Sequence, residues 1–536
     1  MPVGSRERAD VTALLTVVAL VTVVVAVSAL ARRFGVLAPI LLLVAGIVLS
    51  LIPGVPHIDL DPEIVLTWIL PPLLYVAAVN TSVQAFRVNL RPILLLAVGL
   101  VVFTALSVGY ALHLVLPAVP LAAAVALGAV VAPPDAVSAS AIARRVGLPR
   151  RQVAILEGES LINDATALVI FGVAVSAATG RAVSAGDIGL NAALATVGGV
   201  AVGAVGAVVF GALHRRITQP LLDNAVSLIV PFVVYAAGVS IHASGVVAVV
   251  ITGLSLGHRY PILMSAASRL QMEAFWRMVS FLLEGVVFVL VGLQMRQTLD
   301  QLRTPVGTVA LATVVVLVTL ILARFVWMYP ATYLTQLLPR VRARDAAPHP
   351  RVPTLLAWAG MRGVVTLATA LALPATLAHG ARYPRDLFVF LAFATIVVTL
   401  LMQGMTLPAV ARWLRIEPDD PKDDLLAEAA VQQAASRAAR ERLEKEIVGQ
   451  EDELPADVVE RLRGKIDLRA NIAWERLGGR RRETPTEAYS RLRAAMLEAE
   501  RDVFRLARDE GRIPEEVLRD VQRDLDLEES LMRGRK

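Results

Sequence analysis

The sequence predicts an all-α membrane protein with about thirteen transmembrane helices, followed by a helical domain outside the membrane. The chain has 536 residues, of which 56% are hydrophobic, and its mean hydropathy is +0.64. Apolar runs long enough to cross a bilayer recur throughout its first three quarters. The net charge is +12 over residues 1–416 and −6 over residues 417–536. This change near Pro418 predicts a boundary between a transmembrane domain, 1–416, and a tail, 417–536.

The apolar runs give the expected order of the transmembrane helices. They lie at residues 11–31, 36–52, 63–80, 92–116, 120–142, 153–178, 189–213, 221–239, 244–258, 270–294, 305–334, 354–375 and 386–411. The first run ends near Ala29-Leu-Ala31, which resembles a signal-peptidase site. Because the run is long for a signal peptide and Arg32 follows at once, we interpret it as the first transmembrane helix.

Arginine placement predicts the orientation, because cytoplasmic loops of membrane proteins are enriched in basic residues. One alternating set of loops carries Arg32, Arg33, Arg87, Arg91, Arg144, Arg145, Arg150, Arg151, Arg215, Arg216, Arg259, Arg269, Arg340, Arg342, Arg344 and Arg351. The other set carries only Arg181, Arg296, Arg303, Arg382 and Arg385. The first set is therefore expected to be cytoplasmic, with the N-terminus outside and the tail inside.

Two of the apolar runs are interrupted within the membrane. The fifth contains Pro133-Pro134-Asp135, and proline breaks the helical hydrogen-bond ladder. The twelfth contains Gly360-Met-Arg-Gly363, which places Arg362 in an apolar segment. Broken helices at corresponding positions of two halves indicate a transporter built from inverted repeats, with its site where the breaks meet. Two six-helix repeats around a linking seventh helix would place the breaks in spans five and twelve.

The run Glu157-Gly-Glu-Ser-Leu-Ile-Asn-Asp164 places carboxylates at the head of another apolar segment. In a helix, Ser160, Asn163 and Asp164 lie on one face. An ionisable group within the membrane is a functional-site hypothesis by default, because its burial is costly. These hard oxygen ligands and one titratable carboxylate suit a small monovalent cation or a proton. The alternative is a helix start capped by Ser or Asp, with the acids in water.

The tail is expected to form helices near residues 421–449, 455–478, 484–510 and 514–533, with a regulatory, dimer-contacting or purely solvated role. The basic loops lack the aromatic residues and metal-finger spacings of nucleic-acid binding, so we expect no nucleic-acid partner. The chain has no cysteine, hence no thiol chemistry. His242 is expected in a turn, and His258 and His349 in loops, without a functional assignment.

These motifs together resemble the monovalent cation/proton antiporters of the sodium/proton exchanger branch, over roughly residues 11–415. The matching residues are Pro71-Pro-Leu-Leu-Tyr75, Gly128-Ala-Val-Val-Ala-Pro-Pro-Asp135, Glu157-Gly-Glu-Ser-Leu-Ile-Asn-Asp164, Phe275-Trp276, Phe288-Val-Leu-Val-Gly292 and Gly360-Met-Arg-Gly-Val-Val-Thr-Leu-Ala368. The tail more weakly resembles the C-terminal extension of a bacterial subgroup. The resemblance implies a bacterial cytoplasmic (inner) membrane and a homodimer.

The resemblance also implies roles for individual residues. Asp164 would bind cation and proton in turn, with Asp135 and Ser160 beside the ion and the Pro134 carbonyl facing it. Asn163 stands where electrogenic relatives carry a second Asp, which implies electroneutral exchange. A structural ion pair would join Glu159 to Arg362 or to Arg324.

Three departures from the family pattern affect the expected ion site. Pro134 replaces the usual Thr before Asp135, and Ala136 replaces the usual Pro after it. Val76 stands where many relatives have a Glu ligand. Glu284 stands where relatives often have Asn, and it either adds a carboxylate to the site or reaches toward Arg277.

The sequence therefore predicts a secondary transporter, not an enzyme, that exchanges Na⁺, or Li⁺ or K⁺, for H⁺ without a cofactor. A K⁺-preferring antiporter is the first alternative. A cation channel with the same polar pore and a membrane-anchored sensor that signals through its tail are remoter ones. A channel needs no coupling carboxylate, and a sensor would show no flux.

Overall fold

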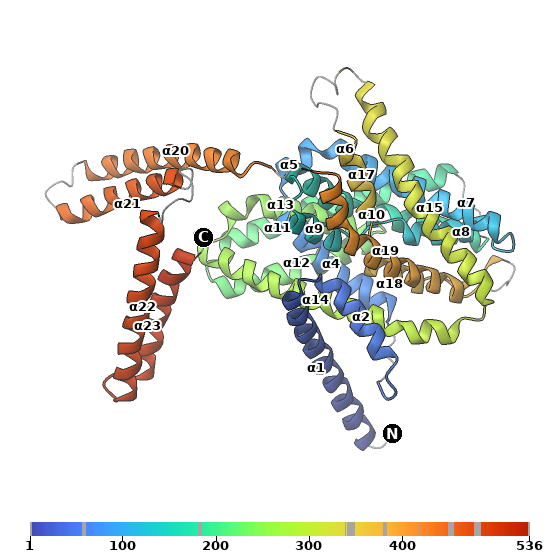
Figure 1. The fold of residues 1–536 in the computed structure, drawn as a ribbon, viewed down its shortest axis with the longest axis horizontal. Helices are drawn as coiled ribbons and strands as arrows, with labels where there is room; N and C mark the ends of the chain where they lie inside the picture. Colours follow the sequence, from blue (N-terminus) through green and yellow to red (C-terminus); the bar gives the residue numbers. More distant parts are fainter. Residues whose placement is uncertain are drawn as a thin grey trace. The chain divides into compact units, whose positions relative to one another are not determined.

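The computed structural model describes residues 3–55, 60–180, 185–337, 339, 349–378, 383–416, 419–448, 455–475 and 484–533. Helices dominate these ranges, and no β-strand occurs within them. The chain divides into two compact units, Met1–Pro418 and Asp419–Lys536 (Figure 1). The predicted all-α fold is confirmed.

The first unit consists of consecutive helices and short helical turns over its described residues. They are α1 (Val3–Phe34), α2 (Ala38–Ser50), α3 (Pro62–Ile64), the π-helical turn η1 (Val65–Ile69), α4 (Leu70–Asn80), α5 (Val83–Val88), α6 (Leu90–Leu94), the π-helical turn η2 (Leu95–Leu100), α7 (Val101–Val115), α8 (Leu121–Val131), α9 (Ala136–Val146), α10 (Arg150–Ala178), α11 (Ala185–Arg216), α12 (Pro220–Ser240), α13 (Gly245–Leu263), α14 (Ala266–Gln301), α15 (Val306–Tyr333), the 3₁₀ turn η3 (Leu334–Leu337), α17 (Arg351–Trp358), α18 (Val364–Leu371) and α19 (Arg385–Trp413).

These helices account for all thirteen predicted spans. Within the described ranges, ten helices or continuous helical runs are long and apolar enough to cross a membrane. The shorter apolar helix α2 and the broken pairs α8/α9 and α17/α18 supply the rest. One detail of the prediction is wrong: His258 lies within α13, not in a loop, because that helix continues to Leu263. Of the arginines used for orientation, Arg181, Arg340, Arg342, Arg344 and Arg382 lie outside the described residues.

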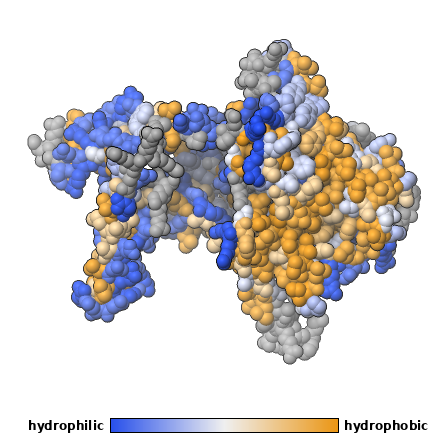
Figure 2. All heavy atoms as spheres, in the orientation of Figure 1, coloured by the Kyte–Doolittle hydropathy of each residue, from blue (hydrophilic) through white to orange (hydrophobic). Residues whose placement is uncertain are grey.

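The outer surface of the first unit is apolar, as a lipid-facing surface must be. Leu106, Val205 and Leu322 are among the large apolar side chains that remain exposed. Figure 2 shows hydrophobic residues gathered over this unit, whereas the tail is mostly hydrophilic. Since bilayer lipid offers no hydrogen bonds, the spanning segments satisfy their backbone groups internally as helices.

The two helix breaks meet inside this unit. Pro133 and Pro134 have no backbone N–H to continue α8. The facing chain leaves helical geometry between α17 and α18. The Asp135 N–H donates to the Met361 carbonyl oxygen at 2.7 Å. A Cβ atom added to Gly363 would lie 2.7 Å from both Cβ and Cγ of Asp135, so this close approach requires glycine.

The second unit contains four described helices, as the sequence predicts. They are α20 (Pro421–Ile447), α21 (Ala456–Glu475), α22 (Pro485–Asp509) and α23 (Glu515–Arg533). Helix α22 begins with a capping box between Thr484 and Glu487. It packs on α23 around buried Leu497 and Leu525. Arg493 binds Glu528 through two hydrogen bonds of 2.7 and 2.8 Å, which holds the pKa of Glu528 below its ordinary value.

Candidate functional site

Helix α10 carries the predicted ion-binding face into the interior. Asn163 is fully buried, Glu159 is 1% exposed, and Ser160 and Asp164 are each 8% exposed. The four side chains leave the helix in two directions. Ser160 and Asp164 line a cavity, whereas Glu159 and Asn163 contact neighbouring elements.

The cavity has a volume of about 930 Å³ and contains three of the predicted acidic residues, Asp135, Asp164 and Glu284. Val76 also lines it. The lining also includes Arg144, whose side chain is 65% exposed, and Arg277, whose side chain is 74% exposed. The cavity therefore extends from buried carboxylates to exposed arginines.

Five carboxylates and three arginines occur in the cavity lining. Each arginine has a partner away from the buried acids. Arg144 pairs with Glu157 at 2.6 Å, and Arg277 pairs with Glu273 at 2.6 Å. Arg269 donates to the Met264 carbonyl oxygen at 2.6 Å. The inner part of the cavity thus holds buried carboxyl groups, whose negative charge on ionisation a bound proton or cation would offset.

Asp135 is held at the break by its own helix start. Its Oδ2 accepts hydrogen bonds from the Ser138 N–H at 3.1 Å and from the Ser138 hydroxyl at 2.5 Å. A carboxylate at this N-terminal position also satisfies a backbone donor that a new helix leaves free. These contacts fix the orientation of the carboxylate beside the cavity.

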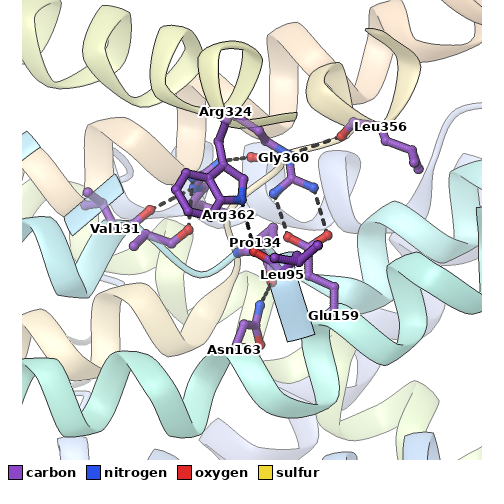
Figure 3. A network of polar contacts seen from close by, with 11 residues as sticks. Leu95, Val131, Pro134, Glu159, Asn163, Arg324, Leu356, Gly360 and Arg362 are labelled. Atoms are coloured by element: carbon purple, nitrogen blue, oxygen red, sulfur yellow. Dashed lines mark hydrogen bonds and ion pairs between the residues drawn. The ribbon is translucent and has the colours of Figure 1, made fainter. Parts of the chain in front are cut away.

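Asn163 and Pro134 lie beside the cavity and are not part of its lining. The Asn163 side-chain amide donates to the Pro134 carbonyl oxygen at 2.9 Å, which ties α10 to the break (Figure 3). Within the described part of the chain, the buried Oδ1 of Asn163 has no hydrogen-bond partner. The Pro134 carbonyl therefore faces Asn163 in this conformation, whereas the sequence led us to expect it to face the ion.

The structural ion pair joins Glu159 to Arg324, the second of the two predicted partners. Arg324 binds both carboxylate oxygens, at 2.7 and 2.9 Å, and its Nε donates to the Leu356 carbonyl oxygen at 3.1 Å. The two side chains are 1% and 3% exposed. This bidentate geometry satisfies the charges of both groups away from water (Figure 3).

Arg362 binds backbone carbonyl groups at the two breaks. It donates to the Val131 oxygen at 2.8 Å, to the Ala132 oxygen at 3.1 Å and to the Gly360 oxygen. These carbonyls lie at ends of α8 and α17, where helices leave acceptors without intrahelical donors. A cation is also favourable at a helix C-terminus. Arg362 thus joins the broken helices directly.

Glu284, on α14, lies in the cavity and not in an ion pair with Arg277. Arg277 pairs instead with Glu273, one helical turn before it. Of the two expected arrangements, the structure therefore shows the one that brings Glu284 to the same cavity as Asp164.

The sequence analysis missed a buried polar cluster behind the cavity wall. His214 and Asp223 are both fully buried and lie 2.5 Å apart, between Nδ1 and Oδ1. Two cavity-lining tyrosines, Tyr75 and Tyr260, share a hydrogen bond between their hydroxyls. Tyr75 stands in one of the matched motifs, but the partner helices that bury this cluster are distant in sequence.

A cavity lined by buried carboxyl groups beside two helix breaks that contact each other is typical of a cation-coupled secondary transporter. The family model described as sodium/hydrogen exchanger, transmembrane, matches residues 18–413. The chain belongs to this family, whose members are secondary transporters and exchange monovalent cations for protons.

Relatives from bacteria extend this similarity. The chain is 36% identical over 533 residues to a protein of Mycobacterium tuberculosis described as an uncharacterized Na⁺/H⁺ exchanger, covering 96% of this chain and 95% of the relative. It is 32% identical to the sodium, potassium, lithium and rubidium/H⁺ antiporter of Bacillus pumilus, covering 70% of this chain and 57% of the relative.

A solved structure supports the fold. The sodium proton antiporter MjNhaP1 from Methanocaldococcus jannaschii superposes with a TM-score of 0.59 at 18% identity, over 76% of this chain and 99% of that structure. The chain is thus a multi-pass membrane protein with an antiporter fold.

Proposed function

We propose that the protein exchanges Na⁺ for H⁺ and that both ions compete for Asp164. The observation that carries this proposal is the position of Asp164 at the inner part of the cavity, with Asp135 and Ser160 in the same lining. Carboxylate and hydroxyl oxygens suit a hard monovalent cation. Every arginine of the lining is engaged elsewhere.

Competition for one carboxylate couples the two fluxes. Cation binding displaces the proton of Asp164, and proton binding displaces the cation, so neither state leaves a bare charge in a site of low dielectric constant. Movement of one helix bundle against the other would expose the site to each side in turn. The lining includes Arg144 and Arg269 of the arginine-rich set, so the positive-inside rule favours a cavity that opens to the cytoplasm.

Na⁺ is the proposed cation, and K⁺ is the alternative. The family description and the named sodium/proton antiporters among the relatives support Na⁺. The Bacillus pumilus relative is named for sodium, potassium, lithium and rubidium, and its name is the observation that favours a broader choice. Val76 in the cavity lining removes a ligand that many family members have, which leaves cation choice to Asp164, Asp135, Ser160 and Glu284.

Proton flux in proteoliposomes tests this function. Purified protein is reconstituted with a pH-sensitive dye inside the vesicles, and Na⁺, Li⁺ or K⁺ is added outside in separate runs. An antiporter should give a cation-dependent pH change, largest for Na⁺. A cation channel would give cation flux without a coupled pH change, and a sensor would give neither. The largest response with K⁺ would replace Na⁺ by the alternative cation.

We also propose electroneutral exchange, because Asn163 stands where a second Asp would supply a second proton. One proton traded for one monovalent cation moves no net charge. The initial rate with Na⁺ should therefore stay the same when a membrane potential is imposed with a K⁺ gradient and valinomycin. Acceleration or inhibition by the potential would show that another group titrates during the cycle, and Glu284 is the first candidate.

The same features bear on the membrane location and the orientation of the protein. We propose a bacterial cytoplasmic membrane with the N-terminus outside and the tail inside, since the arginine-rich loops and the tail then share one side. A homodimer remains a proposal that rests on the family resemblance. Cysteine residues introduced singly into this cysteine-free chain, at position 242 and in the tail, and labelled with an impermeant maleimide would test the orientation.

A further inference from the structure

The His214–Asp223 pair is buried although the mechanism proposed above does not use it. His214 is on α11, two residues before that helix ends, and Asp223 is in the first turn of α12. Both side chains have no exposed surface, and 2.5 Å separates Nδ1 from Oδ1. Within the described residues, His214 Nε2 and Asp223 Oδ2 have no hydrogen-bond partner. The contact between Nδ1 and Oδ1 is therefore the hydrogen bond that holds both side chains.

Aromatic contacts connect this pair to the cation cavity. The His214 ring meets the Tyr260 ring edge-on, with 5.6 Å between centroids and an interplanar angle of 88°. The Tyr260 hydroxyl binds the Tyr75 hydroxyl, and both tyrosines line the cavity. Trp276, a third lining residue, lies 5.5 Å from Tyr75 between ring centroids. His214 thus does not line the cavity itself but contacts Tyr260, which does.

Hydrogen bonding anchors the same wall to α12. Trp276 Nε1 donates to the Ser227 hydroxyl at 2.9 Å, and Ser227 lies one helical turn after Asp223. The wall residues come from α4, α13 and α14, and the residues behind them come from α11 and α12. A change at the pair would therefore reach three helices that line the cavity.

We propose that His214 and Asp223 are positioning residues that hold Tyr260, and through it Tyr75, at the wall of the cation cavity. Removal of either member would leave the other buried without its polar partner, and α11, α12 and Tyr260 would have to adjust. The contact between His214 and Asp223 would thereby influence the apparent affinity for the cation. This inference depends on the proposed antiport function.

The other titratable groups near the pair are few. Tyr260 faces it from α13, and Tyr75 lies beyond on α4. The other nearby titratable side chains on these helices are exposed on the protein surface: Arg215 and Arg216 on α11, and His258 and Arg259 on α13. On α14, Glu273 and Arg277 pair with each other at the exposed end of the cavity. Trp276 is the α14 side chain that reaches the cluster, and it does not titrate.

The test compares Na⁺-dependent exchange in proteoliposomes containing the full chain, over a range of pH. Asp223→Asn removes the charge and keeps the shape of the side chain. Asp223→Asn combined with His214→Gln replaces the ion pair by a neutral hydrogen-bonded pair, which guards against misfolding. Tyr260→Phe keeps the pair and removes the hydroxyl link to Tyr75. His258→Gln, an exposed histidine on the helix of Tyr260, is the matched control.

We expect all three cluster variants to raise KM for Na⁺ about tenfold with a nearly unchanged kcat, as is typical when residues behind an ion site are altered. The control should coincide with the parent protein. Cluster variants that fold and coincide with the parent in KM at every pH would overturn the inference. Absence of exchange in the parent protein would instead refute the proposed function.

Discussion

At the scale of single residues, the buried charges divide into two kinds. Glu159 and Arg324 neutralise each other through two short hydrogen bonds. Asp164 has no arginine partner within the described residues and lines the cavity. We propose that the first arrangement holds the fold and that the second leaves a carboxylate able to exchange ligands. Burial alone would not distinguish these roles; the partners do.

The ion pair leads to a stability prediction. Glu159→Ala should destabilise the protein, because it leaves Arg324 buried without its counter-charge. The loss should be on the order of 3–5 kcal/mol, the value for breaking buried pairs in soluble proteins. Heat stability of the purified protein in detergent measures it. Glu157→Ala, which removes the partner of the largely exposed Arg144, is the control and should change stability little.

A Glu159→Ala protein as heat-stable as the parent but inactive would contradict the structural role. Glu159 would then belong to the ion site.

Helix spacing predicted that Ser160 and Asp164 share a direction, and both line the cavity. Asn163 was expected on the same face, but its side chain contacts the Pro134 carbonyl beside the cavity, because packing against the break decides its partner. The choice of Arg324 over Arg362 depends on how α10, α15 and the second break pack, which spacing cannot specify. Arg362 was expected to need a carboxylate, whereas backbone carbonyls at two helix ends satisfy it. His214 and Asp223 lack any local pattern.

At the scale of elements, the two breaks act as one unit. Asp135 from one break and Met361 from the other share a backbone hydrogen bond, and Gly363 lies against the Asp135 side chain. Prolines predicted the first break and a buried arginine between glycines predicted the second. Their contact could be expected only from the inverted-repeat architecture, since more than two hundred residues separate them.

This contact predicts the effect of one added methyl group. Gly363→Ala should displace the Asp135 side chain, because the new Cβ would lie 2.7 Å from its Cβ and Cγ. We expect at least a tenfold loss in kcat/KM for Na⁺, equivalent to about 1.4 kcal/mol, measured in proteoliposomes. Gly172→Ala is the matched control, because no atom of a neighbouring element lies within 4 Å of the position its Cβ would take. Parent-like kinetics in Gly363→Ala would mean that the position of Asp135 is unimportant for transport.

At the scale of the whole molecule, the proposed transport machinery belongs to one unit. All cavity-lining residues lie within Met1–Pro418. The composition change near Pro418 reflects two solvents, since lipid-facing helices need apolar surfaces and the tail needs charged ones. The sequence says less about the role of the tail, because charged amphipathic helices serve many partners.

Removal of the tail should therefore leave a working transporter. A protein truncated after Arg415 should insert and exchange cations for protons, with altered pH dependence or dimer stability. Proteoliposome assays matched for the amount of inserted protein would check this. Complete loss of flux from a well-inserted truncated protein would show that the tail takes part in the transport cycle.

The most direct test of the account is Asp164→Asn in proteoliposomes. Asparagine has the shape of aspartate but carries no proton and no negative charge, so competition between cation and proton at this position cannot occur. The variant should remain folded, with a heat stability in detergent close to that of the parent protein. Its Na⁺-driven proton flux should fall to the level of empty vesicles. Proton flux that survives in the folded variant would contradict the central role of Asp164.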